Sequence, residues 1–158
     1  MGVSDSFGES FAKAQLSSGN TIALSGNVFL SLADIDKGSA VQIARELDEL
    51  GFSIMATSGT FKLIEEAGIK VEKVLKLSEG RPNIVDLLTN KQIQLVINTT
   101  DSIDSKNDAF NIRNSVIQNN ISYFTTVSAG LAVIEGVKKL KKLKNELNVK
   151  SIQEYLVG

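Results

Sequence analysis

Three hydroxyl side chains surround one glycine in the stretch from Thr57 to Thr60, which reads Thr-Ser-Gly-Thr and precedes a helix-like segment. Free N–H groups at a helix N-terminus attract anions, and hydroxyls placed there can complete a cradle for phosphate. Lys37 follows the first apolar run and Lys76 lies near the end of the third, and both supply positive charge. Together these groups match the charge and the acceptors of a phosphate monoester. An ordinary helix cap beside two solvated lysines is the alternative interpretation.

Polar side chains also end other apolar runs of the chain. Ser31 ends the first run, and Asn98, Thr99 and Thr100 end the fourth. An amide both donates and accepts hydrogen bonds, as ribose hydroxyls and base edges require, so Asn98 and Thr100 suit a nucleoside. Alternatively, these residues only end a strand and cap the turn that follows it.

Apolar runs alternate with amphipathic, helix-like stretches, and this alternation decides where the polar groups lie. Strands are expected at Asn27–Leu32, Phe52–Thr57, Lys70–Leu77, Ile93–Thr100 and Ile121–Thr126. Helices are expected at Phe7–Leu16, Lys37–Gly51, Phe61–Gly68, Asn83–Asn90, Phe110–Gln118 and Ala129–Leu147, with a polar loop at Asp101–Ala109. Strict alternation predicts right-handed βαβ units and a Rossmann-like three-layer sandwich, with a mostly parallel five-stranded sheet between helices. Because ligands of such sheets bind beyond the carboxyl ends of the strands, the polar groups are expected to meet at one edge.

The composition excludes several classes of function. The 158 residues include 17 basic and 18 acidic side chains, so neither nucleic acid nor a membrane surface is expected as a partner. The absence of cysteine and histidine removes disulfides, the usual zinc sites and histidine-dependent nucleophiles. No apolar run approaches the ~18 residues of a membrane span, and no signal peptide pattern is present, so a cytoplasmic protein is expected. Glycine-rich dinucleotide and P-loop motifs are also absent.

Four short strings, in this order on the alternating units, carry a resemblance to a known family: Ala56–Thr60 (ATSGT), Glu79–Asp86 (EGRPNIVD), Ile97–Thr100 (INTT) and Tyr123–Thr126 (YFTT). Their ordered combination resembles the methylglyoxal synthase-like domain at the C-terminus of the carbamoyl-phosphate synthase large chain. The resemblance implies a methylglyoxal synthase-like regulatory domain over residues 25–158. Residues 1–24 resemble the tail of the preceding ATP-grasp synthetase half and a linker, which implies a fragment of a longer chain.

In the family that the chain resembles, this domain binds allosteric effectors and performs no chemistry of its own. The resemblance implies UMP as an inhibitor and IMP as an activator, with ornithine activating from the interface with the synthetase half. The chain is then a non-catalytic part of a glutamine-hydrolysing ligase of pyrimidine and arginine biosynthesis. Its partners would be the rest of the large chain and the glutaminase small chain. No cofactor is expected in this part, and ATP, Mg²⁺ and K⁺ are expected only in the synthetase halves.

The resemblance also assigns roles to individual residues. The effector phosphate falls to Lys37, Thr57, Thr60 and Lys76 with Ser31 close by, the nucleoside to Asn98, Thr99 and Thr100, and part of an ornithine site to Thr125. Members activated by acetylglutamate have a tryptophan where this chain has Lys76, so the lysine favours a nucleotide. The stretch Asp101–Ala109 departs from the glycine- and arginine-containing loop of enterobacterial members. The balance between UMP and IMP is therefore left open.

The main alternative is an enzyme, methylglyoxal synthase, which has the same fold and eliminates phosphate from dihydroxyacetone phosphate. That enzyme uses an aspartate in a Gly-Gly-Asp stretch together with a histidine. The corresponding stretch here, Glu79–Pro82, reads Glu-Gly-Arg-Pro, and the chain has no histidine. Proton abstraction next to a carbonyl needs a positioned base, which this pattern does not supply. A purine-nucleotide cyclohydrolase and a plain interaction domain with an empty rim are further alternatives.

Overall fold

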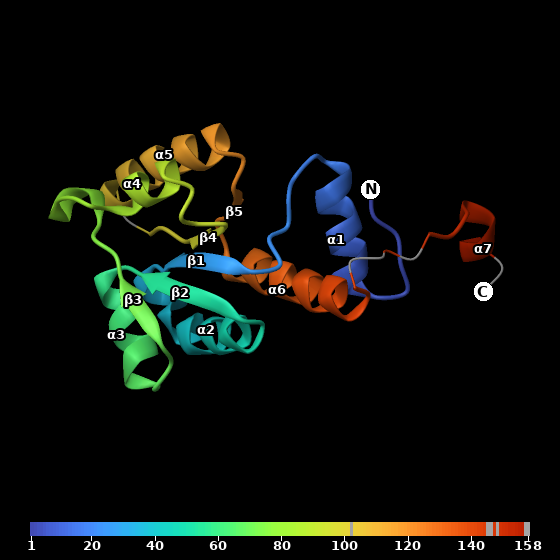
Figure 1. Cartoon of the computed structure of the whole chain (residues 1–158), viewed down its shortest axis with the longest axis horizontal. Coiled ribbons are helices and arrows are strands. Elements are labelled where there is room, and N and C mark those ends of the chain that lie inside the picture. Colours follow the sequence, from blue (N-terminus) through green and yellow to red (C-terminus); the bar gives the residue numbers. More distant parts are fainter. Residues whose placement is uncertain (102, 145–146, 148, 157–158) are drawn as a thin grey trace.

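A five-stranded, all-parallel sheet forms the centre of the computed structural model, which describes residues 1–101, 103–144, 147 and 149–156 (Figure 1). The strands lie in the order β3-β2-β1-β4-β5. Their bounds are β1 (Gly26–Ser31), β2 (Phe52–Ala56), β3 (Val71–Lys73), β4 (Leu95–Asn98) and β5 (Ser122–Phe124). The expected α/β fold with a parallel sheet is confirmed.

Helices cover both faces of this sheet. They are α1 (Phe7–Ser17), α2 (Ala40–Glu49), α3 (Ser58–Glu66), α4 (Ile84–Thr89), α5 (Ile103–Gln118), α6 (Val127–Lys142) and α7 (Ile152–Leu156), with 3₁₀ turns η1 (Asp34–Ser39) and η2 (Leu77–Glu79). Figure 1 shows α4 and α5 on one face, and α2 and α3 on the other. No helix in the described ranges is both long enough and apolar enough to cross a membrane.

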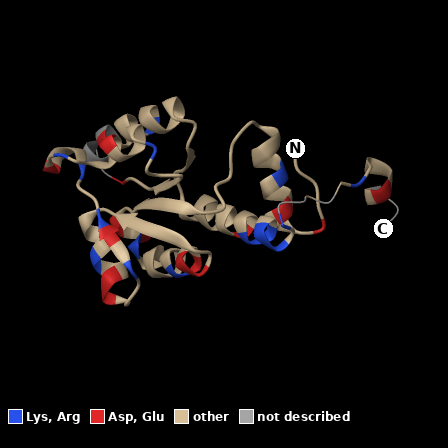
Figure 2. Cartoon of the chain, viewed as in Figure 1, with Lys and Arg blue, Asp and Glu red and all other residues tan. Residues whose placement is uncertain are grey.

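Alternate residues of β1 enter two separate hydrophobic clusters, one on each face of the sheet. Val28 and Leu30 pack in the cluster that contains Leu47 of α2, whereas Phe29 packs in the cluster that contains Ile112 of α5. All three β1 side chains are fully buried. A strand buried on both faces needs a continuous apolar run, which explains why β1 has no alternation of apolar and polar residues. Figure 2 accordingly shows β1 and β2 without charged residues, which gather on the helices.

Helix α1 packs closely along α6 (Figure 1). A Cβ atom added at Gly8 would lie 2.7 Å from the backbone oxygen of Glu135, so only glycine allows this approach. Phe11 extends from the same helix to Phe124 of β5, and the centroids of these two rings lie 6.3 Å apart. The Phe7 and Phe11 ring centroids lie 6.1 Å apart, and both spacings are typical of aromatic pairs. The predicted domain boundary at residues 24 and 25 stays a prediction, but α1 shares the core of the sheet domain.

The largest differences from the predicted helices are at the start of α5, at the end of α6 and in a short additional helix. Helix α5 begins at Ile103, so most of the stretch expected as a polar loop is helical, although residue 102 lies outside the described part. Helix α6 ends at Lys142 rather than at Leu147, because Lys144 takes a left-handed backbone conformation with φ of 49°. Residues 145–146 of that expected helix lie outside the described part. The short helix α7 was not expected from the sequence.

Candidate functional site

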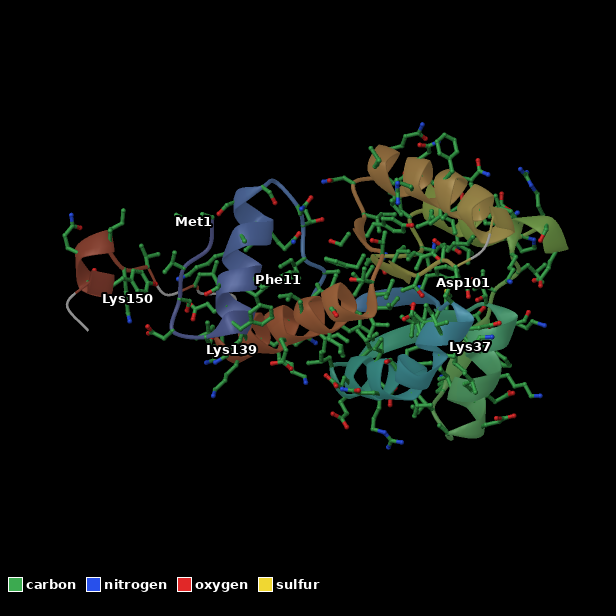
Figure 3. All side chains as sticks on the ribbon, turned by 180° about the vertical axis from the view of Figure 1, so that it is seen from behind. Met1, Phe11, Lys37, Asp101, Lys139 and Lys150 are labelled. Atoms are coloured by element: carbon green, nitrogen blue, oxygen red, sulfur yellow. The ribbon has the colours of Figure 1, made fainter. Side chains whose placement is uncertain are left out.

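A cavity of about 670 Å³ opens at the carboxyl ends of β1, β2 and β4. Figure 3 shows Lys37 and Asp101 at this end of the molecule, whereas Lys139 and Lys150 lie at the opposite end. The cavity brings together seven of the residues that the sequence predicts for effector binding: Ser31, Lys37, Thr57, Thr60, Lys76, Asn98 and Thr99. Their roles as ligands stay predictions, but their convergence is a property of the fold.

Two of these hydroxyls hold the backbone that follows β1. The Thr60 hydroxyl accepts a hydrogen bond from the backbone N–H of Leu32 at 3.0 Å, and the Thr99 hydroxyl accepts one from Ala33 at 2.8 Å. The chain leaves the sheet at this point, so these N–H groups no longer face a neighbouring strand. Thr60 is fully buried and Thr99 is nearly so. Both side chains therefore fix the floor of the cavity.

Thr57 occupies the N-cap position of α3, but its hydroxyl does not cap the helix. The hydroxyl instead donates a hydrogen bond to the Ser31 hydroxyl at 3.1 Å, across the ends of β1 and β2. The alternative interpretation of this stretch as an ordinary helix cap is therefore wrong, because the Thr57 hydroxyl bonds to Ser31 and Ser58 is the first helical residue. The first N–H groups of α3 thus face the cavity without a side-chain cap from Thr57, where they can attract an anion.

Lys37 reaches over this first turn of α3. A Cβ atom added at Gly59 would lie 2.9 Å from the Lys37 Nζ atom, so the glycine leaves room for the ammonium group. Lys37 forms an ion pair with Asp34, three residues earlier on η1. The hydrogen bond and charge of Lys37 lower the pKa of Asp34 from its ordinary value, and the charge of Lys76 adds a smaller contribution. Both predicted lysines therefore act on the same part of the cavity.

The opposite wall comes from β4 and α5, with β5 behind β4. Asn98 is nearly buried and donates a hydrogen bond to the Tyr123 hydroxyl at 3.3 Å. The guanidinium carbon of Arg113 lies 5.8 Å from the centre of the Tyr123 ring, a cation–π geometry that ties α5 to β5. Asp108 and Ile112 of α5 also line the cavity. This wall combines an amide, a carboxylate and an apolar surface.

Two predicted residues do not reach the cavity. Among the residues described at this edge, Thr100 is half-buried and Thr125 is exposed, and neither lines the cavity. Thr125 lies directly before Thr126, whose hydroxyl accepts a hydrogen bond from the Ala129 N–H and caps α6. The assigned roles of Thr100 in nucleoside binding and of Thr125 in an ornithine site stay predictions.

Four polar residues that line the cavity were not predicted from the sequence as site residues: Asp34, Ser78, Asp101 and Asp108. Asp34 and Asp101 follow the ends of β1 and β4, so the rule that ligands bind beyond strand ends would have included them. Ser78 lies on η2 and Asp108 within a stretch expected as a loop, and no sequence signal marks either. Among the described side chains, no group of three or more acidic residues is arranged to hold a metal ion.

Comparison with known proteins agrees with this geometry. Residues 39–125 match the MGS-like domain family. The chain is 48% identical over 157 residues to the carbamoyl phosphate synthase large chain, C-terminal section, of Aquifex aeolicus (strain VF5), across 98% of this chain and 29% of that protein. It is 46% identical over 158 residues to the carbamoyl phosphate synthase large chain of Pseudomonas putida (strain KT2440), across 100% of this chain and 14% of that protein. The chain thus spans less than a third of the length of these curated relatives.

A solved structure has the same fold at much lower sequence identity. The methylglyoxal synthase of Elizabethkingia anophelis NUHP1 superposes with a TM-score of 0.55 and 19% identity, across 87% of this chain and 92% of that chain. This likeness concerns the fold alone. The family match covers more than half of the chain, and the site lies where open parallel sheets bind their ligands. The protein belongs to the MGS-like domain family, in the form found in the carbamoyl phosphate synthase large chain.

Proposed function

We propose that the protein is the allosteric regulatory domain of a glutamine-dependent carbamoyl-phosphate synthase, and that its cavity binds nucleoside monophosphates. The observation that carries this proposal is the convergence of Lys37 and Lys76 on a cavity that also contains the N-terminus of α3. A phosphate monoester carries close to two negative charges near neutral pH. Two ammonium groups and the first N–H groups of a helix match this charge and these acceptors.

The remaining space suits the nucleoside. A volume of about 670 Å³ lies within the range of small-molecule sites, about 300–1,000 Å³. Asn98 and Thr99 lie on the β4 side of the cavity, next to Asp101 and Asp108. Amide and carboxylate groups can accept hydrogen bonds from ribose hydroxyls and can pair with base edges. UMP as an inhibitor and IMP as an activator are the effectors proposed for this site, with ornithine bound near Thr125.

The domain regulates chemistry that takes place elsewhere in the assembled enzyme. On this proposal, the ligase reaction of pyrimidine and arginine biosynthesis, with its ATP, Mg²⁺ and K⁺, belongs to the synthetase halves of the large chain. The glutaminase small chain supplies the second partner, and the whole assembly works in the cytoplasm. The 46–48% identity to two large-chain relatives over nearly the whole of this chain supports this assignment.

A lyase of the methylglyoxal synthase type is the second candidate, favoured by the shared fold and by the carboxylates of Asp34, Asp101 and Asp108 at the cavity. A base must take a proton from the carbon next to the carbonyl of dihydroxyacetone phosphate. The pKa of Asp34 is lowered by Lys37, which makes this carboxylate a weaker base. The chain also lacks the histidine and the Gly-Gly-Asp stretch of that enzyme, so the regulatory function fits this sequence better.

Isothermal titration calorimetry with UMP, IMP and ornithine tests the regulatory proposal directly. We expect at least one nucleotide to bind, and Lys76→Gln to weaken that binding, while Lys150→Gln at the opposite end of the molecule leaves it unchanged. No detectable binding of either nucleotide at millimolar concentration would refute the proposal. Formation of methylglyoxal from dihydroxyacetone phosphate would favour the lyase instead.

A further inference from the structure

The mouth of the cavity contains an ion pair that already uses one of the two phosphate-binding ammonium groups. Lys37 Nζ contacts the Asp34 carboxylate, whose side chain is 84% exposed, whereas that of Lys37 is 32% exposed. The backbone N–H of Asp34 donates a hydrogen bond to the Asp101 carboxylate at 3.2 Å. Asp101 follows β4, so this bond ties the start of η1 to the neighbouring strand end. Asp34 is thereby held beside the position proposed for the phosphate.

The position of Lys37 explains why an anion is needed there. Its ammonium group lies over Gly59, in the first turn of α3. A helix N-terminus carries a partial positive charge, so a cation at this end is repelled unless an anion lies between or beside them. No acidic residue lies in the first turn of α3 itself. Asp34 is the anion that the fold supplies to Lys37.

We propose that Asp34 is an internal competitor of the ligand phosphate, which holds Lys37 in the free protein and must release it when a phosphate monoester binds. This inference rests on the proposed function, because it assumes that phosphate binds between Lys37 and α3. A phosphate dianion replaces the carboxylate on Lys37 and also brings charge for Lys76 and acceptors for the N–H groups of α3. A ligand that has a single carboxylate would merely replace the Asp34 carboxylate on Lys37 with another carboxylate. Asp34 therefore sets the affinity of the site and favours phosphate monoesters over carboxylates.

The competition can be measured with Asp34→Asn, which keeps the size and the backbone hydrogen bond but removes the charge. Exposed ion pairs contribute modestly, and the variant also removes repulsion between Asp34 and the phosphate, so we expect UMP or IMP to bind about three- to tenfold more tightly. Asp36→Asn is the matched control, because Asp36 lies on the same turn but does not line the cavity, and it removes the same formal charge. Its affinity for the nucleotide should stay within about twofold of the wild type.

A double-mutant cycle separates competition from a general effect of charge. In a Lys37→Gln background, Asp34 has no ammonium group to hold, so Asp34→Asn should improve nucleotide affinity less than it does in the wild type. The side-chain ¹⁵N resonance of Lys37, identified by its loss in Lys37→Gln, reports the ion pair without any ligand. This resonance should shift in Asp34→Asn and stay in place in Asp36→Asn.

The outcomes distinguish the two proposals. Tighter nucleotide binding by Asp34→Asn alone, with coupling to Lys37, supports the competition. Nucleotide binding that is unchanged or weaker in Asp34→Asn refutes the competition and leaves the proposed function intact. If neither UMP nor IMP binds to any of the variants, the proposed function fails and the competition fails with it. In that case a shifted Lys37 resonance would still identify the ion pair as a structural contact only.

Discussion

Thr60 lies fully buried beneath the cavity, and its replacement by valine removes one hydroxyl while preserving the shape of the side chain. The Leu32 N–H, which donates to this hydroxyl at 3.0 Å, then has no partner in a buried position. An unsatisfied buried donor costs about 1–3 kcal/mol. We therefore expect Thr60→Val to lower the free energy of unfolding by this amount, with a fall in Tm of about 2–4 °C for each kcal/mol in a domain of this size.

Chemical denaturation and hydrogen exchange at the Leu32 amide test this expectation together. Thr89→Val is the matched control, because Thr89 is exposed and its hydroxyl only donates to the backbone oxygen of Val85. The control should stay within about 0.5 kcal/mol of the wild type. Thr60→Val should also accelerate exchange at Leu32 and weaken nucleotide binding. A Thr60→Val protein as stable as the control, with Leu32 still protected, would refute the view that this hydroxyl holds the cavity floor.

Three further predictions concern the second lysine, the contact of α1 and one ion pair. Lys76→Gln should weaken UMP or IMP binding about five- to tenfold in calorimetry without changing stability, and equal affinity would contradict its role. Gly8→Ala places a methyl group 2.7 Å from the Glu135 backbone oxygen, so unfolding experiments should show a loss of about 1–3 kcal/mol. A hydrogen bond from Lys138 at 2.8 Å lowers the pKa of Glu46 below its ordinary value of 4.5, so this stabilisation is present above that pH and is lost as the pH falls through the lowered pKa. Glu46→Gln should therefore cost about 0.5 kcal/mol near neutral pH, and this cost should shrink as the pH falls below 4.5, as denaturant titrations across that range can show.

The layout of the fold follows from the sequence because the strand signals are strong and local. Phe29 and its neighbours form a continuous apolar run, which is typical of a parallel strand buried on both faces. The start of α5 could not be predicted in the same way. Among the α5 side chains that the structure describes, the buried apolar ones are Ala109, Ile112 and Val116, and the polar stretch before them has little helical periodicity in the sequence. Packing of Ile112 and Val116 in the cluster beneath the sheet stabilises this helix, and the sequence pattern does not mark where the helix begins.

The candidate site is predictable in its position and less so in its hydrogen bonds. Strand order brings Ser31, Thr57 and Asn98 to one edge, as expected for a parallel sheet. The sequence does not reveal that the Thr60 and Thr99 hydroxyls accept hydrogen bonds from the backbone that follows β1. Which hydroxyls bind the backbone depends on where the chain leaves the sheet, and this is a property of the folded backbone. Residue type therefore predicts polarity at the site but not which groups stay available to a ligand.

Helix α6 connects the two ends of the molecule. It begins after β5, at the same edge of the sheet as the cavity, and its 16 residues rise about 24 Å. At Gly136 it meets α1, where a Cβ atom would lie 3.5 Å from the Gly8 backbone oxygen. A continuous helix tilts as a stiff rod, so a few degrees of rotation at Thr126 would become a displacement of an ångström or more at α1. Because Gly8 and Gly136 let the two backbones approach closely, such a tilt of α6 would move α1 with it.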